Sequence, residues 1–195
     1  MFRRTNRVAV TGSAVALAAV AAVAFVPTGA DASIPAPGRT VSAATSFGRP
    51  GGTTPSVTQQ RQTAKKLALR FYVPFATGDT SVLDHVLSKN WIDRPLAEGQ
   101  QSGREGFKPV VAGYRTIFPD LTVSHQAVIV SADAKTVTVR SEFTGTQKAD
   151  FLGVPSTGRK ITFRTTDVHR LRHGKIVETW HLEDLFGAYQ QLIAK

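Results

Sequence analysis

The stretch GTQKADFLGVPSTGRKITFRTTDVHRLRHGKIVETWHLED (residues 145–184) decides the fold of this chain. Two strand-like segments are joined there by a tight turn at residues 172–175, behind a glycine-rich loop. Side chains alternate between the two faces of a strand. One face of the first segment therefore carries Ile161, Phe163, Thr165, Asp167, His169 and Leu171. One face of the second carries Ile176, Glu178, Trp180, Leu182 and Asp184. Titratable groups on otherwise apolar faces are typical of a lined pocket and costly in a sealed core.

The flanking segments complete a pattern of helices followed by strands. Apolar residues at helical spacing predict helices over residues 58–76, 79–87, 104–118 and 184–194. A period of two predicts strands over residues 121–131, 135–146, 160–172 and 175–183, joined as antiparallel hairpins. This order is typical of an α+β domain. We expect a cone-shaped, curved antiparallel sheet wrapped around the N-terminal helices, with one open end suited to a ligand.

The N-terminal residues are set apart from this domain. Basic residues precede an uncharged, Ala/Val-rich run over residues 8–26, and Ala30-Asp31-Ala32 has the small-x-small pattern of a signal-peptidase site. We expect a secretory signal peptide over residues 1–32; the alternative is an uncleaved membrane anchor. Residues 33–57 are rich in Pro, Gly, Ser and Thr, which predicts a disordered linker. One domain remains, residues 58–195, in a chain that contains no cysteine.

The net charge of the chain bears on the classes of partner that it is expected to bind. A formal net charge of +10 could attract nucleic acid or an anionic surface. The basic residues form no run of five or more and do not alternate with aromatic residues, so nucleic-acid binding is not expected. We expect a secreted protein, extracellular or associated with the cell wall, with no stable membrane insertion after the signal peptide is cleaved.

Several motifs together resemble a known family. They are Phe118-Pro119-Asp120-Leu121, Gly145-Thr146, the loop segments FLGVP (151–155) and TGR (157–159), GKIVETW (174–180) with Asp184, and Gln191-Leu192. The chain is similar to the SnoaL-like polyketide cyclases, or ester cyclases, over residues 58–192. This resemblance implies the cone-shaped α+β barrel of nuclear transport factor, in agreement with the pattern of elements.

The resemblance also implies an activity. It is a cofactor-free intramolecular aldol condensation that closes a ring on a small hydrophobic or aromatic polyketide-like molecule. Asp184 stands at the position of the family's general acid/base, and His169 resembles an assisting pocket histidine. Such chemistry needs a base near the carbon acid and a donor for the enolate oxygen. An apolar pocket beside Trp180 would raise the pKa of Asp184. No metal site is expected, because the spacing of histidines and carboxylates fits no metal motif.

Other residues are candidates for the wall of the pocket. Aromatic candidates for substrate binding are Trp180, Trp91, Phe163, Tyr114 and Phe118, and polar candidates are Asp167 and Glu178. Each has a structural alternative: Asp184 can cap the helix after it, His169 can be a satisfied sheet histidine, and Trp180 can belong to the core. Asp167 and Glu178 can pair with arginines across the sheet. His181 and Glu183 are expected to face away from the pocket, since their parity is opposite to that of Asp184.

Two departures from the family leave the function open. Gln147 stands where family members commonly have histidine, and Asp93-Arg94 stand where many carry another histidine. The alternatives to a cyclase are an exported small-molecule binding domain without turnover, and a dimeric interaction module that uses the outer sheet face. In each case a homodimer is a natural assembly.

Overall fold

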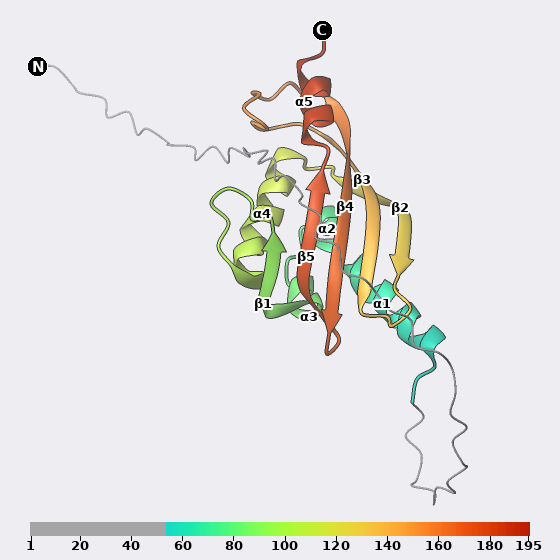
Figure 1. Cartoon of the computed structure of the whole chain (residues 1–195). Helices are drawn as coiled ribbons and strands as arrows, with labels where there is room; N and C mark the ends of the chain where they lie inside the picture. Colours follow the sequence, from blue (N-terminus) through green and yellow to red (C-terminus); the bar gives the residue numbers. More distant parts are fainter. Residues whose placement is uncertain (1–53) are drawn as a thin grey trace, which may run out of the picture. The chain divides into compact units, whose positions relative to one another are not determined.

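The structure, a computed structural model, describes residues 54–195 as helices packed against one five-stranded sheet (Figure 1). The predicted signal peptide and most of the predicted linker lie outside the described residues. Within residues 54–195 no helix is long and apolar enough to cross a membrane. The elements in chain order are α1 (Val57–Arg70), α2 (Val73–Thr77), α3 (Val82–Val86), β1 (Leu87–Arg94), α4 (Gly103–Ile117), β2 (Thr122–Val130), β3 (Thr136–Thr146), β4 (Lys160–Arg172), β5 (Lys175–Glu183) and α5 (Leu185–Ile193).

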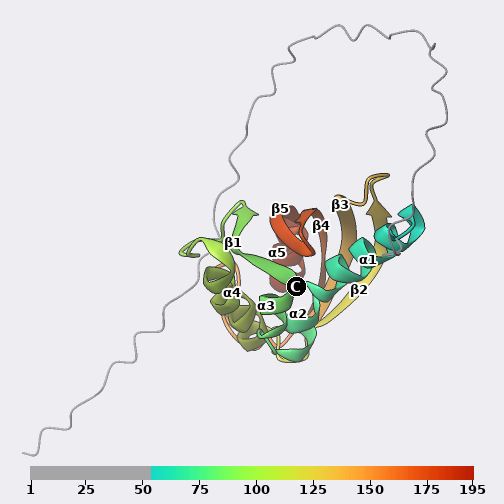
Figure 2. The same ribbon diagram turned by 90° about the horizontal axis from the view of Figure 1, so that it is seen from below.

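The sheet has the order β1-β5-β4-β3-β2 and curves around helices α1 to α4 (Figure 2). Strands β2 to β5 pair antiparallel, as the sequence predicts. Strand β1 was not predicted, and it pairs parallel with β5 at the edge of the sheet. Its signal is weak because only Leu87, Trp91 and Asp93 are buried among its eight residues. The predicted α+β cone is therefore confirmed, with a mixed rather than purely antiparallel sheet.

The predicted helix over residues 58–76 is interrupted before Pro74. Helix α1 ends at Arg70, and Pro74 lies in the first turn of α2, where its missing N–H costs least. Tyr72 lies at this break as the N-cap residue of α2 and is almost fully buried. The break directs the Tyr72 side chain at the inner face of the sheet.

Strand β5 contains a β-bulge that the sequence pattern does not reveal. Arg170 pairs with Glu178 and Leu171 pairs with Ile176, so Val177 has no partner on β4. An extra residue in one strand shifts all later side chains to the opposite face. Trp180 and Leu182 consequently point outward, whereas the inner face carries Thr179, His181 and Glu183. The predicted inner face of β5 is wrong beyond Ile176, and the predicted inner face of β4 is correct.

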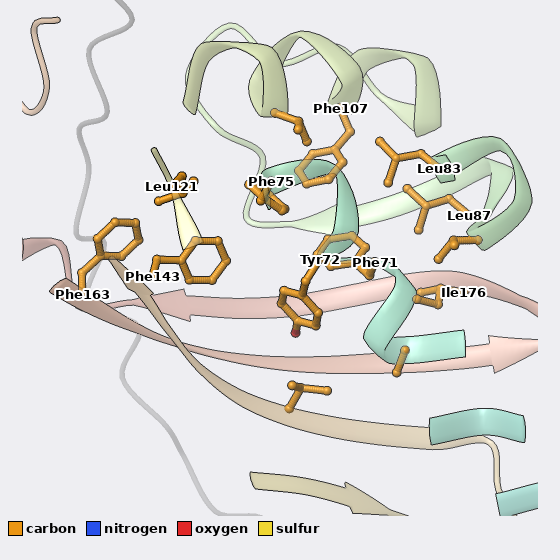
Figure 3. Packing of buried hydrophobic residues seen from close by; sticks show 14 of the residues in the cluster. Phe71, Tyr72, Phe75, Leu83, Leu87, Phe107, Leu121, Phe143, Phe163 and Ile176 are labelled. Atoms are coloured by element: carbon orange, nitrogen blue, oxygen red, sulfur yellow. The ribbon is translucent and has the colours of Figure 1, made fainter. Parts of the chain in front are cut away.

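Aromatic and aliphatic side chains pack together between the sheet and the helices (Figure 3). Phe71 stacks on Phe107 with ring centroids 5.3 Å apart, and Phe143 stacks on Phe163 at 5.4 Å. Edge-to-face contacts connect these pairs, as between Phe75 and Phe143. In Figure 3 the hydroxyl oxygen of Tyr72 points away from the helices toward the strands. The core is thus apolar near the helices and becomes polar near the middle of the sheet.

Two of the sequence motifs meet at the end of α4. Asp120 accepts hydrogen bonds from Thr146 N at 2.7 Å and from Thr146 Oγ1 at 2.8 Å. A Cβ at position 145 would lie only 2.8 Å from Cβ of Phe118, so glycine permits this close approach. These contacts join the start of β2 to the end of β3.

Candidate active site

Asp167 is the centre of a buried polar cluster on the inner face of β4. Its Oδ2 accepts a hydrogen bond from Tyr72 Oη at 2.8 Å and one from Thr165 Oγ1 at 2.9 Å. His169, two residues further along the strand, contacts the same Tyr72 oxygen through Nε2 at 3.2 Å. Among residues 54–195, both hydrogen bonds to Asp167 end on Oδ2, which leaves Oδ1 available to take a proton.

The buried setting shifts the pKa values of these groups in opposite directions. Burial raises the pKa of Asp167 to about 6, although the hydrogen bonds from Tyr72 and Thr165 oppose this rise. Burial lowers the pKa of His169 to about 3, so its imidazole is neutral. Burial, followed by the charge of Asp167, raises the pKa of Tyr72 well above its ordinary value. Asp167 is therefore poised to exchange a proton near neutral pH, while His169 and Tyr72 keep fixed protonation states.

His169 continues the polar cluster toward β5 and β1. Its Nδ1 lies 2.9 Å from Oγ1 of Thr179, and Trp91 Nε1 donates to the same oxygen at 3.0 Å. His169 is fully buried, and its ring lies against that of Phe71 with centroids 4.9 Å apart. The surroundings of His169 are thus those of the structural alternative, a buried histidine on a strand with hydrogen-bond partners for both ring nitrogens.

His181 lies directly across from Asp167 on the inner face of β5. Its Nδ1 lies 2.6 Å from Glu183 Oε1, and its Nε2 lies 3.2 Å from Asp93 Oδ1 and 2.8 Å from the carbonyl oxygen of Pro95. Burial opposes the charge on the ring, but hydrogen bonds to Asp93 and Glu183 outweigh it and raise the pKa of His181 to about 11. An imidazole that is protonated near neutral pH thus faces a carboxyl group with a raised pKa.

The surroundings of Asp184 differ from the expected apolar pocket. Asp184 is exposed and caps α5, since its Oδ1 accepts a hydrogen bond from Gly187 N at 2.9 Å. Trp180, expected beside it as a pocket wall, lies on the outer face of the sheet with 41% of its surface exposed. The bulge in β5 explains both differences, because the expected face assumed unbroken alternation.

The other aromatic candidates lie inside the domain. Trp91, Phe163 and Phe118 are buried in the core, and Trp91 also donates the hydrogen bond to Thr179. Tyr114 on α4 is half-buried, and burial together with the charges of Glu183 and Asp167 raises its pKa. Tyr114 is therefore an aromatic candidate that interacts with the charges of Glu183 and Asp167 and is still partly exposed.

The side chains of Glu178 and Gln147 make contacts that stabilise the fold. Glu178 is buried between two arginines, with Oε1 2.8 Å from Arg94 Nε and Oε2 in contact with Arg170. The expected pairing of Glu178 with an arginine across the sheet is thus present. Gln147, which replaces a family histidine, is fully buried and binds the loop through Val154, Pro155 and Thr157.

A cavity of about 590 Å³ opens beside β1 and the start of α4. Trp91, Asp93 and Leu96 are part of its wall, together with charged Lys89 and Glu105. Asp93 contributes to this wall and also contacts His181. The Asp93 side chain therefore connects the cavity to the His181 imidazole.

Sequence reasoning missed Tyr72, Asp93, Thr179, His181 and Glu183 as members of the polar cluster. Tyr72 lies inside the single helix predicted over residues 58–76, and the other four depend on the missed strand or on the bulge. The His-x-Glu spacing of residues 181 and 183 was visible as two titratable groups of one parity, but the pattern assigned that parity to the wrong face.

Comparison with known proteins places this geometry in a family. TsrD from Streptomyces laurentii has the same fold, with a TM-score of 0.63 at 24% identity over 69% of this chain and 98% of that one. A candidate polyketide cyclase from Bacillus cereus is 32% identical, with a TM-score of 0.58 over 67% of this chain and 80% of that one. IdmH of Streptomyces antibioticus, a candidate polyketide cyclase, is 27% identical with a TM-score of 0.59, over 66% and 97% of the two chains. A search of curated proteins found no match. The sequence model of the SnoaL-like polyketide cyclases matches residues 66–192, and this chain belongs to that family.

Proposed function

We propose that this protein is a cofactor-free cyclase that closes a ring by aldol-type acid/base chemistry on a small hydrophobic or aromatic polyketide-like carbonyl compound. Membership of the family and the candidate cyclases among its structural neighbours support a cyclase-type function. The observation that carries the chemistry is the pairing of Asp167 with His181 across β4 and β5 on the inner face. Two facing groups whose pKa values are moved to about 6 and about 11 suit the roles of base and cation.

Asp167 acts as the general base. Its carboxylate takes a proton from the carbon next to a carbonyl group. Both ring nitrogens of His181 already bind other groups, so its positive charge acts on the enolate oxygen through space and not by a hydrogen bond. The enolate carbon then attacks a second carbonyl of the same molecule, which forms the ring bond and an alkoxide. Protonated Asp167 returns its proton to that alkoxide, so the carboxylate is regenerated and no external reactant is consumed.

The substrate reaches this pair from the less buried side of the cluster. Asp167 itself is only 6% exposed, whereas Glu183 and Tyr114 are half-buried. The neutral phenol of Tyr114 is available to donate a hydrogen bond to a substrate oxygen, since its pKa is raised. Binding at Asp167 therefore requires side chains at this boundary to move.

The test uses a panel of aromatic poly-β-keto methyl esters and follows both ring closure and deuterium exchange next to the carbonyl group. We expect Asp167→Asn to lose on the order of 10²-fold or more in rate, and His181→Gln to lose a similar factor. Asp184→Asn is the matched control, since it removes one exposed carboxylate and keeps a capping side chain. A collapse of the rate in Asp184→Asn with normal turnover in Asp167→Asn would restore Asp184 as the base.

Two outcomes of the same experiment distinguish the alternative functions. Retention of an ester, with no exchange or ring closure in the unmodified protein, supports a binding domain without turnover. Failure to bind any ester in the panel supports the interaction module. Both results would reject the proposed chemistry.

The proposal includes export, supported by the N-terminal sequence. The basic lead, the uncharged run and Ala30-Asp31-Ala32 are those of a cleavable signal peptide. N-terminal sequencing of the protein from the culture medium should find Ser33 as the first residue. An intact N-terminus in the membrane fraction would instead indicate the uncleaved anchor.

The proposal also includes a homodimer formed by the outer face of the sheet. Leu182 is 77% exposed, Trp180 on the same face is 41% exposed, and Val168 on β4 pairs with Trp180. Adjacent large apolar side chains that face water favour contact with another apolar surface. A second copy offers a self-complementary one when two chains meet around a two-fold axis.

A further inference from the structure

A continuous chain of hydrogen bonds runs through the interior from β1 to the proposed base. It passes from Trp91 to Thr179, His169, Tyr72 and Asp167, with successive distances of 3.0, 2.9, 3.2 and 2.8 Å. These five residues come from β1, β5, β4 and the break between α1 and α2. All are buried, at most 6% exposed, so water does not compete with their partners. A chain of this length in a dry interior holds its members in one arrangement.

The chemistry of the donors permits only one order of protons. The indole N–H of Trp91 can only donate, so Thr179 Oγ1 accepts there. At the other end Asp167, when ionised, can only accept, so the single phenol proton of Tyr72 points at Oδ2. Nε2 of His169 must therefore carry the proton that it donates to the Tyr72 oxygen. Nδ1 is then unprotonated and accepts from the Thr179 hydroxyl, which leaves no group in the chain without a partner.

Other titratable groups surround this chain without interrupting it. From β5, His181 and Glu183 face Asp167, and from α4 Tyr114 does so. From β2, the ring of His125 lies 4.8 Å from the ring of Tyr72, while its Nδ1 is 3.0 Å from Ser141 Oγ. Burial lowers the pKa of His125, so the imidazole beside Tyr72 tends to stay neutral. The proton order of the chain is therefore set by its two ends.

We propose that Tyr72 and His169 are positioning residues for the proposed base: neutral, Nε2-protonated His169 orients the Tyr72 hydroxyl, which holds Asp167 Oδ2 and directs Oδ1 to the substrate. The inference rests on the proposed function for the role of Asp167, whereas the proton order stands on the contacts alone. Without the Tyr72 donor, Asp167 keeps its buried position and loses one of the two hydrogen bonds that stabilise its carboxylate. The pKa of Asp167 must then rise.

The test needs no substrate and uses nuclear magnetic resonance on the purified protein. Nitrogen-15 spectra of the imidazole should show His169 with a protonated Nε2 and a bare Nδ1, unchanged between pH 5 and pH 8. Carbon-13 titration of the Asp167 carboxyl should show an upward shift of its pKa in Tyr72→Phe, which keeps the ring and removes only the hydroxyl. Thr179→Val, which removes the donor to Nδ1, should allow the other tautomer of His169 to appear.

The matched control is Tyr114→Phe, which removes a neighbouring phenol that donates no hydrogen bond to Asp167 in the described structure. It should leave the pKa of Asp167 unchanged. A His169 protonated at Nδ1, or an Asp167 titration that is identical in Tyr72→Phe and the unmodified protein, would overturn the inference. If an ester is turned over, Tyr72→Phe should also move the acid limb of the pH–rate profile upward with little change in KM. Absence of turnover would count against the proposed function only, because the spectra decide the proton order separately.

Discussion

At the residue scale, Asp184 lies between strand β5 and helix α5. Its carboxylate accepts a hydrogen bond from the backbone N–H of Gly187, the third residue of the helix. Replacing such a capping residue by alanine removes the partner of an otherwise free backbone N–H. We expect Asp184→Ala to lower the free energy of unfolding by about 1 kcal/mol, and Asp184→Asn to change it little, since asparagine caps equally well. Urea denaturation of the two variants measures this difference. Equal losses in both would show that the charge, and not the cap, stabilises the protein.

The candidate residues show what a sequence pattern can and cannot locate. Regular alternation on β4 correctly predicted that Phe163, Asp167 and His169 share the inner face. The same rule failed for Trp180 and Asp184, because one unpaired residue earlier in β5 moves them. Tyr72 could not be recognised, since its hydroxyl meets Asp167 across 95 positions of sequence. Contacts between residues so far apart depend on the packed fold and leave no local periodicity.

At the scale of elements, the bulge in β5 sets which side chains enter the site. Val177 is the residue without a partner, so its deletion should give a regular strand in which His181 and Glu183 still face inward. Deleting Trp180 also removes one residue but follows the bulge, so it should turn His181 outward and expose it. We expect the pKa of His181 to stay high in the first variant and to fall toward its ordinary value in the second. Proton magnetic resonance titration of His181 distinguishes them, and equal effects of the two deletions would reject this account.

The elements themselves differ in how visible they are in the sequence. Strands β2 to β5 were predicted because each is nine or more residues long and follows a period of two over all of its length (β3 and β4) or part of it (β2 and β5). Strand β1 has only three buried positions and a register irregularity between Leu87 and Ile92, so its periodicity is too short to detect. The family motifs instead mark contacts between distant segments, such as that between Asp120 and Thr146, which local periodicity does not predict.

At the scale of the whole molecule, the proposed homodimer depends on the outer face of the sheet. Leu182 and Trp180 present apolar surface to water on one copy, and burying it against a second copy is favourable by about 25 cal/mol for each Å². Leu182→Lys should therefore shift a dimer to monomers, because it replaces apolar surface at the proposed interface with a charge on each copy. Sedimentation velocity over a range of concentrations measures the shift. The control is Val57→Lys, which adds the same charge at an exposed position on α1. If the unmodified protein stays monomeric at high concentration, the proposed homodimer is wrong.

The stability of the whole domain should depend on pH through its buried titratable groups. The pKa of His181 rises from 6.5 to about 11 on folding, so the protonated ring contributes stability that is fully present below pH 6.5. This contribution decreases as the pH rises from 6.5 toward 11, by at most about 1.4 kcal/mol per pH unit for one proton. His169, with its pKa lowered from 6.5 to about 3, acts in the other direction: stability rises with pH between 3 and 6.5.

Asp167 opposes His169 over part of the acid range. Its pKa is raised from 3.8 to about 6, so stability falls as the pH rises between these values. Between pH 7 and 9 neither Asp167 nor His169 changes its protonation state. Raising the pH in this window should therefore lower the free energy of unfolding through His181 alone among these three groups. Urea denaturation at several values in this window should give a negative slope for the unmodified protein and a nearly flat one for His181→Gln. Because glutamine leaves Asp93 and Glu183 without their cation, His181→Gln should also be less stable at pH 7. A flat slope in the unmodified protein would mean that His181 is not held as a cation, and the proposed stabilisation of the enolate would lose its basis.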